Sequence, residues 1–182
     1  MRAVFLDRDG VLNAAIVKDG KPFPPPTVDD LVILDEAGEG CKLLRDAGFK
    51  LVCVTNQPDI ARGSTSAEAV AAINDRVRDE LVLDQLRICP HDDTDDCACR
   101  KPKPGMLVDA AAELGIELSL SYMVGDRWRD VDAGVAAGCK TVFVDRGYDE
   151  PKPASADFTT RSTFDACLWI ASQTKTIVGA NS

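Results

Sequence analysis

The sequence predicts a single α/β domain in which a mostly parallel sheet is covered by helices on both faces. Short apolar runs rich in β-branched residues alternate with segments of helical periodicity, and this alternation is typical of parallel sheets. The length of 182 residues fits one domain with a sizeable core, so we expect residues 1–182 to form one unit. Hydrophobic residues make up 45% of the chain and charged residues 28%, which is the mix of an ordinary globular protein.

Apolar periodicity and flanking turn residues place the expected elements in order. Strands are expected at 3–6, 50–55, 86–89, 122–124 and 141–144. Helices are expected at 39–47, from a capping box at Thr65–Glu68 through Leu81, and at 106–114, 130–137 and 164–172. Glycines at 48, 115 and 138 are stop signals for three of these helices. We expect the proline-rich connector 21–26 to be extended and the polar end 173–182 to fray.

Acidic side chains follow the first expected strand. Active sites in open parallel sheets lie beyond the carboxyl ends of the strands, so these positions are the places to search. Asp7 and Asp9 point the same way if the strand geometry continues. Two like charges this close favour a bound cation or one protonated carboxyl group. The alternative is a solvated Asp-Gly turn.

Two further strand ends carry polar groups of the same kind. Thr55, Asn56 and Gln57 follow one strand, and Asp126 follows another with Asp130 beyond it. Each group alone also fits an ordinary turn or a helix cap. Together they supply the carboxylates and hydrogen-bond donors that a magnesium–phosphate site needs. The cationic residues near them are Arg62, Arg100, Lys101 and Lys103.

Four ordered motifs resemble those of the haloacid-dehalogenase-like (HAD) phosphohydrolase superfamily. They are DRDGVLN at 7–13, VTNQ at 54–57, CRKPKPGM at 99–106 and VGDRWRD at 124–130. The stretch NQPDIARG at 56–63 and a Cys/His loop narrow the resemblance to the D-glycero-D-manno-heptose 1,7-bisphosphate phosphatases and the histidinol-phosphate phosphatases. It covers residues 1 to about 172. It implies a three-layer α/β/α Rossmann-like fold, and the short spacing of the motifs leaves no room for a large cap domain.

The resemblance implies a role for each residue of the motifs. Asp7 is the nucleophile that forms an aspartyl-phosphate, and Asp9 is the general acid and base. Mg²⁺ is held by Asp7, the backbone carbonyl of Asp9, and Asp126. Thr55 and Lys101 stabilise the phosphoryl oxygens, with Lys103 as the competing lysine. Arg100 is the substrate-recognition residue; Asn56, Gln57 and Arg62 are further substrate-binding candidates, and Asp130 supports the metal site.

A second metal site is expected in the loop 89–99. Cys89, His91, Cys97 and Cys99 provide the thiolate and imidazole ligands of a closed tetrahedral zinc site. Their C-x-H…C-x-C spacing matches the zinc loop of the phosphatase subgroup. Disulfides or an unmetallated remnant are the alternatives. We expect a structural zinc ion that orients Arg100 and Lys101 towards the active site.

Charge and composition limit the partners. The net charge of −9 disfavours general binding to nucleic acid or to anionic membranes. The chain shows no transmembrane run and no signal-peptide core, so we expect a cytoplasmic protein, and a monomer.

The expected substrate is a small phosphorylated sugar. The first choice is the 7-phosphate of D-glycero-D-manno-heptose 1,7-bisphosphate, although residues 14–20 depart from the substrate loop of the heptose enzymes. The alternative is a histidinol-phosphate phosphatase or another small sugar-phosphate phosphatase. A non-catalytic, zinc-stabilised binding module is disfavoured because all five residues that the reaction needs are present: Asp7, Asp9, Thr55, Lys101 and Asp126.

Overall fold

The structure, a computed structural model, describes residues 1–178 of the chain. Its centre is a six-stranded sheet in which every neighbouring pair of strands is parallel. In their order across the sheet, the strands are β5 (Gln85–Cys89), β4 (Lys50–Asn56), β1 (Ala3–Leu6), β6 (Tyr122–Gly125), β7 (Lys140–Val144) and β8 (Phe158–Thr160). The parallel sheet predicted from the sequence is confirmed.

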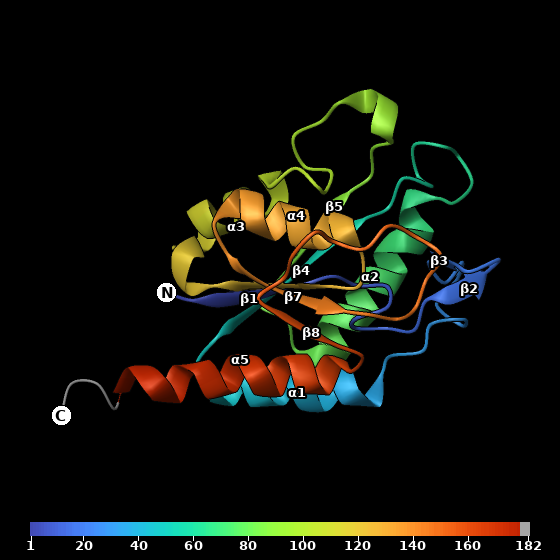
Figure 1. The fold of residues 1–182 in the computed structure, drawn as a ribbon. Coiled ribbons are helices and arrows are strands. Elements are labelled where there is room, and N and C mark those ends of the chain that lie inside the picture. The colour runs from blue at the N-terminus through green and yellow to red at the C-terminus, as the bar shows by residue number, and fades with distance from the viewer. Residues whose placement is uncertain (179–182) are drawn as a thin grey trace.

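Helices cover both faces of this sheet (Figure 1). One face carries α1 (Asp35–Asp46), α2 (Ala67–Leu81) and α5 (Thr163–Val178), and the other carries α3 (Gly105–Leu114) and α4 (Trp128–Ala137). Alternation along β1 divides the core between the two faces. Val4 and Leu6 pack with α1, α2 and α5, whereas Ala3 and Phe5 pack with α3 and α4. The three-layer α/β/α fold is therefore confirmed.

Local signals in the sequence predict the helix ends, but the N-cap of α2 lies one residue later than predicted. Gly115 adopts the left-handed conformation directly after α3, with φ of 65°, as the predicted stop signal requires. At the start of α2, the Ser66 side chain accepts a hydrogen bond from the backbone N–H of Ala69. The cap is therefore Ser66, and the capping box predicted for Thr65 and Glu68 is wrong by one position.

Two helices extend four residues or more beyond their predicted bounds. α1 begins at Asp35 rather than at 39, and its first turn holds Asp35 and Glu36, which the helix dipole favours there. α5 continues to Val178 rather than ending at 172, and the remainder of the predicted fraying, at 179–182, lies outside the described residues. Within residues 1–178, none of the helices combines the length and the apolar content that crossing a bilayer requires.

A β-hairpin replaces the simple connector expected before α1. β2 (Ile16–Lys18) and β3 (Lys21–Phe23) pair in antiparallel fashion, and the turn residues Asp19 and Gly20 both have positive φ, 49° and 74°. The extended conformation predicted for the proline-rich stretch holds in β3, but its pairing was not predicted. Strand β8 was also not predicted. All three strands are short, and none is fully buried.

The register of the central strands positions the site. Leu6 lies opposite Cys53 of β4 on one side and opposite Val124 of β6 on the other. The chain therefore leaves β1, β4 and β6 at the same carboxyl edge. This arrangement brings Asp7, Thr55 and Asp126 together although they are far apart in the sequence.

Candidate active site

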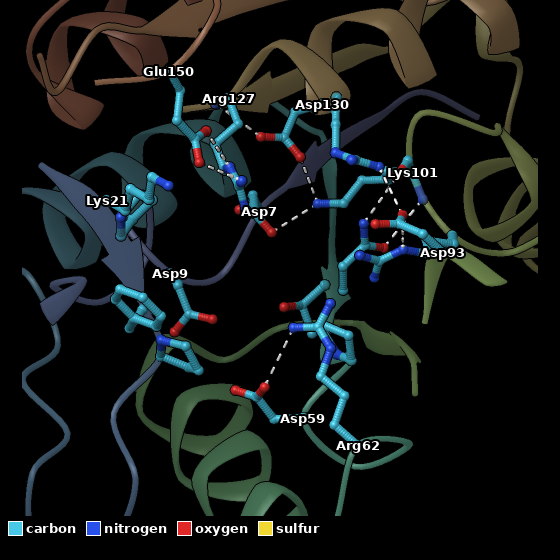
Figure 2. A pocket seen from close by; sticks show the side chains of 18 residues that line it. Asp7, Asp9, Lys21, Asp59, Arg62, Asp93, Lys101, Arg127, Asp130 and Glu150 are labelled. Carbon is cyan, nitrogen blue, oxygen red and sulfur yellow. Dashed lines mark hydrogen bonds and ion pairs between the residues drawn. The ribbon is translucent and has the colours of Figure 1, made fainter. Parts of the chain in front are cut away.

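A pocket of about 270 Å³ opens at this carboxyl edge (Figure 2). Asp7, Asp9, Thr55 and Lys101 all line it. The proline-rich segment of the hairpin and the loop after β5 supply further walls, as the absence of a large cap predicts. Four residues from three of the motifs therefore meet in one cavity.

A tight turn after β1 brings the backbone close to Asp126. The carbonyl oxygen of Arg8 accepts hydrogen bonds from the N–H groups of Leu12 and Asn13, at 2.8 and 3.0 Å. Gly10 lies in this turn with φ of 88°, and a Cβ atom there would stand 1.8 Å from Oδ2 of Asp126. Glycine is thus required for both its conformation and its lack of a side chain.

Three carboxylates and one ammonium group form a buried cluster beside the pocket. Asp7, Asp126 and Asp130 place carboxylate oxygens within 4.8 Å of one another. The Nζ atom of Lys101 lies 2.7 Å from Oδ1 of Asp7 and 2.6 Å from Oδ1 of Asp130, and it also donates to the carbonyl oxygen of Val54 at 2.7 Å. Figure 2 shows Lys101 reaching between Asp7 and Asp130.

Burial perturbs the ionisation of this cluster. Desolvation raises the pKa of Asp7 to about 6; the Lys101 ammonium opposes this shift, and the Asp130 and Asp9 carboxylates add to it. Desolvation and the charge of Asp7 also hold the pKa of Asp126 well above its usual range. The pKa of Lys101 is raised because the attraction of Asp130 and Asp7 outweighs its burial. Ionising all three carboxyl groups against one ammonium group is therefore unfavourable unless a further cation is present.

The cluster fits a divalent cation. Both carboxylate oxygens of Asp126 are buried and make no hydrogen bond of good geometry, although the Tyr148 hydroxyl lies beside them. A buried ionisable group without partners is costly, and hard oxygen donors are the ligands that Mg²⁺ prefers. Such an ion accounts for the unpartnered oxygens of Asp126 and would favour ionisation of the clustered carboxyl groups.

The side chain of Asp9 lies apart from this cluster (Figure 2). Its carboxylate accepts hydrogen bonds from Arg8, Asn13 and Gln57. The expected contribution of Asp9 to the metal is its backbone carbonyl, so its side chain is left available for the pocket. Figure 2 shows Asp9 on the same side of the pocket as Lys21 of the hairpin.

The two candidate lysines have different positions. Lys101 is 2% exposed and contacts the buried carboxylates, whereas the Lys103 side chain is 47% exposed and pairs with Asp96 on the loop surface. Asn56 exchanges two hydrogen bonds with the backbone of Lys101, at 3.0 and 3.1 Å. The structure therefore brings Lys101, and not Lys103, to Asp7.

Gln57 is buried and does not line the pocket, unlike the other substrate-binding candidates. Its amide nitrogen donates to Oδ2 of Asp9 at 2.8 Å and to Oγ1 of Thr55 at 2.9 Å. It therefore lies behind Asp9 and Thr55. The geometry fits a residue that orients these two side chains better than one that contacts substrate.

Arginines gather where the loop after β5 meets the pocket. Arg100 and Arg129 both donate to Oδ1 of Asp93, at 2.8 and 3.1 Å, and Arg62 binds Asp92 through two nitrogens at 2.7 and 2.6 Å. All three arginines line the pocket, and so does Asp93.

Several pocket residues were not found from the sequence. Arg129 lies over the ring of Trp128, with 4.9 Å between the guanidinium carbon and the ring centroid, and Trp128 itself does not line the pocket. Arg127 is held by two hydrogen bonds to Glu150, which comes from the segment between β7 and β8. Lys21 enters from the hairpin. The arrangement of the hairpin and of the segment after β7 depends on tertiary structure that no local pattern indicates.

The Cys/His loop forms a compact ligand set. Sγ of Cys89 lies 3.6 Å from Sγ of Cys97 and 3.7 Å from Nδ1 of His91, and Sγ of Cys99 lies 3.4 Å from Cys97 and 3.3 Å from His91. Tetrahedral zinc, with Zn–S bonds near 2.3 Å, separates its ligand atoms by about 3.5–3.8 Å. Burial opposes ionisation of Cys97, but hydrogen bonds from Cys99 and other neighbours lower its pKa to about 7. The four side chains thus fit one tetrahedral ion.

The carboxylate cluster at the carboxyl edge of a parallel sheet is the arrangement expected of a HAD-like hydrolase. The family described as HAD-hydrolase-like matches residues 98–165. The D-glycero-beta-D-manno-heptose-1,7-bisphosphate 7-phosphatase of Yersinia pestis is 38% identical over 85% of this chain and 84% of that protein. The D-glycero-alpha-D-manno-heptose-1,7-bisphosphate 7-phosphatase of Photorhabdus laumondii is 32% identical over 90% of this chain and 93% of that protein.

A solved structure agrees with these relatives. The D,D-heptose 1,7-bisphosphate phosphatase from B. bronchiseptica, complexed with magnesium and phosphate, matches with a TM-score of 0.82 and 29% identity, over 95% of this chain and 99% of that one. The chain belongs to the HAD-like hydrolases and, among them, to the family of the heptose-bisphosphate phosphatases. The resemblance seen in the four motifs is confirmed.

Proposed function

We propose that this protein is a magnesium-dependent phosphatase that removes the 7-phosphate of D-glycero-β-D-manno-heptose 1,7-bisphosphate. The observation that carries the proposal is the pairing of Asp7 with Lys101 at 2.7 Å, within a cluster of buried carboxylates that adjoins the pocket. The names of the relatives support the substrate, and the magnesium and phosphate of the related solved structure support the chemistry.

The reaction proceeds in two displacements at phosphorus. An oxygen of Asp7 attacks the phosphorus atom and forms an aspartyl-phosphate, while Asp9 gives its proton to the departing sugar oxygen. Asp9 then takes a proton from the water that cleaves this intermediate. Lys101 and Thr55 lie where they can donate hydrogen bonds to the phosphoryl oxygens, on which transition-state charge is spread.

Mg²⁺ would be held by the side chains of Asp7 and Asp126 and by the backbone carbonyl of Asp9. When bound, it supplies positive charge that lets the anionic nucleophile approach the anionic phosphate. Asp130 supports this arrangement from behind, because one of its oxygens accepts from Lys101 and the other accepts from the backbone N–H of Arg127.

Zinc in the loop would be structural. The four ligands leave no free position for a reactive water on a tetrahedral ion. Cys99 is followed directly by Arg100 and Lys101, so an ion fixed at Cys99 restrains both side chains at the pocket. In this proposal, zinc acts on catalysis only through the positions of these two residues.

The distribution of charge in the pocket supports a substrate with two phosphates. Asp7 and Lys101 are available for the reacting phosphate. Arg62, Arg100 and Arg129 line the same pocket, where they bind aspartates of the loop. A second phosphate can take the place of these carboxylates, because guanidinium groups bind both in the same planar geometry.

The proposal extends to the whole chain. In this proposal the protein is a single domain and a monomer in the cytoplasm, and it acts on a small metabolite without binding nucleic acid or membrane. The net charge of −9 disfavours nucleic acid and anionic membranes, and six of the 21 lysines and arginines line the pocket, where a small anionic metabolite can bind.

Turnover with matched concentrations of both anomers of the heptose bisphosphate, the 7-monophosphate and histidinol phosphate tests the substrate. We expect the highest kcat/KM for the β-anomer of the bisphosphate. A hundredfold preference for histidinol phosphate would overturn the choice of substrate but leave the phosphatase chemistry standing.

A further inference from the structure

Arg8 is a charged side chain enclosed in the core directly beside the site. It separates Asp7 from Asp9 in the chain and is 0% exposed. Its Nε and one terminal nitrogen donate to Oδ1 of Asp9 at 3.2 and 3.1 Å, and the same terminal nitrogen is 3.0 Å from Oδ2. The guanidinium group therefore binds both oxygens of the carboxylate that faces the pocket.

The other end of this guanidinium group is held by Asn74 of α2. Its second terminal nitrogen donates to Oδ1 of Asn74 at 2.6 Å, and both side chains are buried. Asn74 lies on the apolar face of α2, among Val70, Ile73 and Val77. A polar side chain in such a position is costly unless it is hydrogen-bonded, so this contact accounts for its presence.

The remaining contacts of Asp9 come from two amides. Asn13 donates to Oδ1 at 3.0 Å and Gln57 donates to Oδ2 at 2.8 Å. The Asp9 side chain is 16% exposed and lines the pocket. The carboxylate is thus fixed from behind by three side chains, of which only Arg8 is itself anchored to a helix.

We propose that Arg8, held in place by Asn74, is a positioning residue that fixes the Asp9 carboxyl group for proton transfer. This inference rests on the proposed function, in which Asp9 is the general acid and base. Neither Arg8 nor Asn74 lines the pocket, and Asp9 is the pocket residue to which the Arg8 side chain donates hydrogen bonds.

The chemistry of the first step gives this role a specific signature. The bond from phosphorus to the leaving oxygen breaks as the bond from Asp7 to phosphorus forms, and the proton of Asp9 passes to the leaving oxygen. A sugar alkoxide needs that proton, because it is a poor leaving group. The 4-nitrophenolate ion leaves without it. Misplacing Asp9 therefore slows sugar phosphates far more than 4-nitrophenyl phosphate.

The experiment compares kcat/KM for both substrates in Asn74→Leu, which keeps the size of the side chain but removes the oxygen that holds Arg8. The parameter kcat/KM reports the steps up to departure of the leaving group. We expect a loss of at least about tenfold with the heptose bisphosphate and of less than about threefold with 4-nitrophenyl phosphate. Asn74→Asp keeps the acceptor oxygen, so we expect wild-type kcat/KM for both substrates. Asp75→Asn, at the exposed neighbouring position, is the matched control, and we expect it to leave both kcat/KM values unchanged.

Equal losses on the two substrates, or no loss on either, would overturn the positioning role. If Asn74→Leu does not fold, Arg8→Lys carries the same expectation, because it keeps the charge but cannot bind both oxygens of Asp9. If the wild-type chain prefers another alkyl phosphate, that compound replaces the heptose bisphosphate as the proposed substrate, and its kcat/KM is compared with that of 4-nitrophenyl phosphate. A wild-type chain that hydrolyses no phosphate monoester overturns the proposed function itself.

Discussion

Two clusters of side chains that could hold a metal ion lie at the carboxyl edge of the same sheet. One follows the central strands β1 and β6 and consists of Asp7, Asp126 and Asp130, all buried. The other follows the edge strand β5 and consists of Cys89, His91, Cys97 and Cys99, of which only Cys89 is buried. The first offers hard oxygen donors beside an open pocket, and the second offers four thiol and imidazole donors, a complete set for a tetrahedral ion.

This difference shows how the position in the sheet suits the task. The central strands are paired on both sides, so groups at their ends are held rigidly, as reacting groups must be. A loop after an edge strand has fewer such restraints, and a metal ion can supply the ones that are missing. The carboxylates would thus hold an ion for its chemistry, and the thiols would hold one for its geometry.

The largest expected effect is at the carboxylate cluster. Asp7→Asn keeps the shape of the side chain but removes the nucleophile, so we expect kcat to fall by at least about a thousandfold while the fold is retained. Turnover together with circular dichroism and zinc content checks both parts. Unchanged hydrolysis in this variant would refute the assignment of Asp7.

The two lysines test whether proximity to the carboxylates decides function. Lys101→Met removes the charge beside Asp7 and Asp130, and we expect kcat/KM to fall by about 10²–10³-fold. Lys103→Met is the matched control, with a change below about twofold, because its partner Asp96 lies on the surface. Equal effects of the two substitutions would contradict the placement of Lys101.

Removing zinc tests whether the second cluster acts only through geometry. Metal analysis should find about one zinc per chain. We expect Cys99→Ser to lower the unfolding temperature and to lower kcat/KM about tenfold, through Arg100 and Lys101. The apparent magnesium affinity should stay the same. A change in magnesium affinity as large as the change in kcat/KM would show that the two clusters are not separate.

The smallest expected effect is a pH dependence of stability in the magnesium-free protein. The pKa of Asp7 is raised from 3.8 to about 6, so the folded state keeps a proton that the unfolded chain has already lost. Stability therefore falls as the pH rises from about 4 to about 6. Thermal unfolding should show a decrease of several degrees, which saturating magnesium abolishes and Asp7→Asn reduces. A rise over the same interval in the magnesium-free protein would contradict the shift.

The central part of the molecule could be predicted from sequence because its signals are local. The buried run Ala3–Leu6 indicates a strand, and the acidic residues after it mark the carboxyl edge. The cysteine spacing indicates a metal loop, and the structure brings its four ligands together. The strands missed were β2, β3 and β8, which are short and incompletely buried, so alternation gave no signal for them.

The partners of the proposed catalytic side chains could not be predicted in the same way. Arg8 was overlooked because a charged residue between two aspartates fits a solvated turn. Its partner carried a signal, since Asn74 interrupts the apolar face of α2, but only the fold shows that this face meets Arg8. Gln57 follows β4, as predicted, but it was assigned to substrate binding. The sequence does not show whether a side chain contacts Asp9 from the pocket or from the protein interior.

The cysteines outside the loop have a practical consequence. Cys41, Cys53, Cys139 and Cys167 are buried, and burial raises the pKa of each thiol, so these four resist alkylation in the folded protein. Cys97 and Cys99 are partly exposed. A chromogenic thiol reagent applied to the native chain would therefore react first at the loop. Its reaction rate would report loss of zinc in real time, without any label added to the protein.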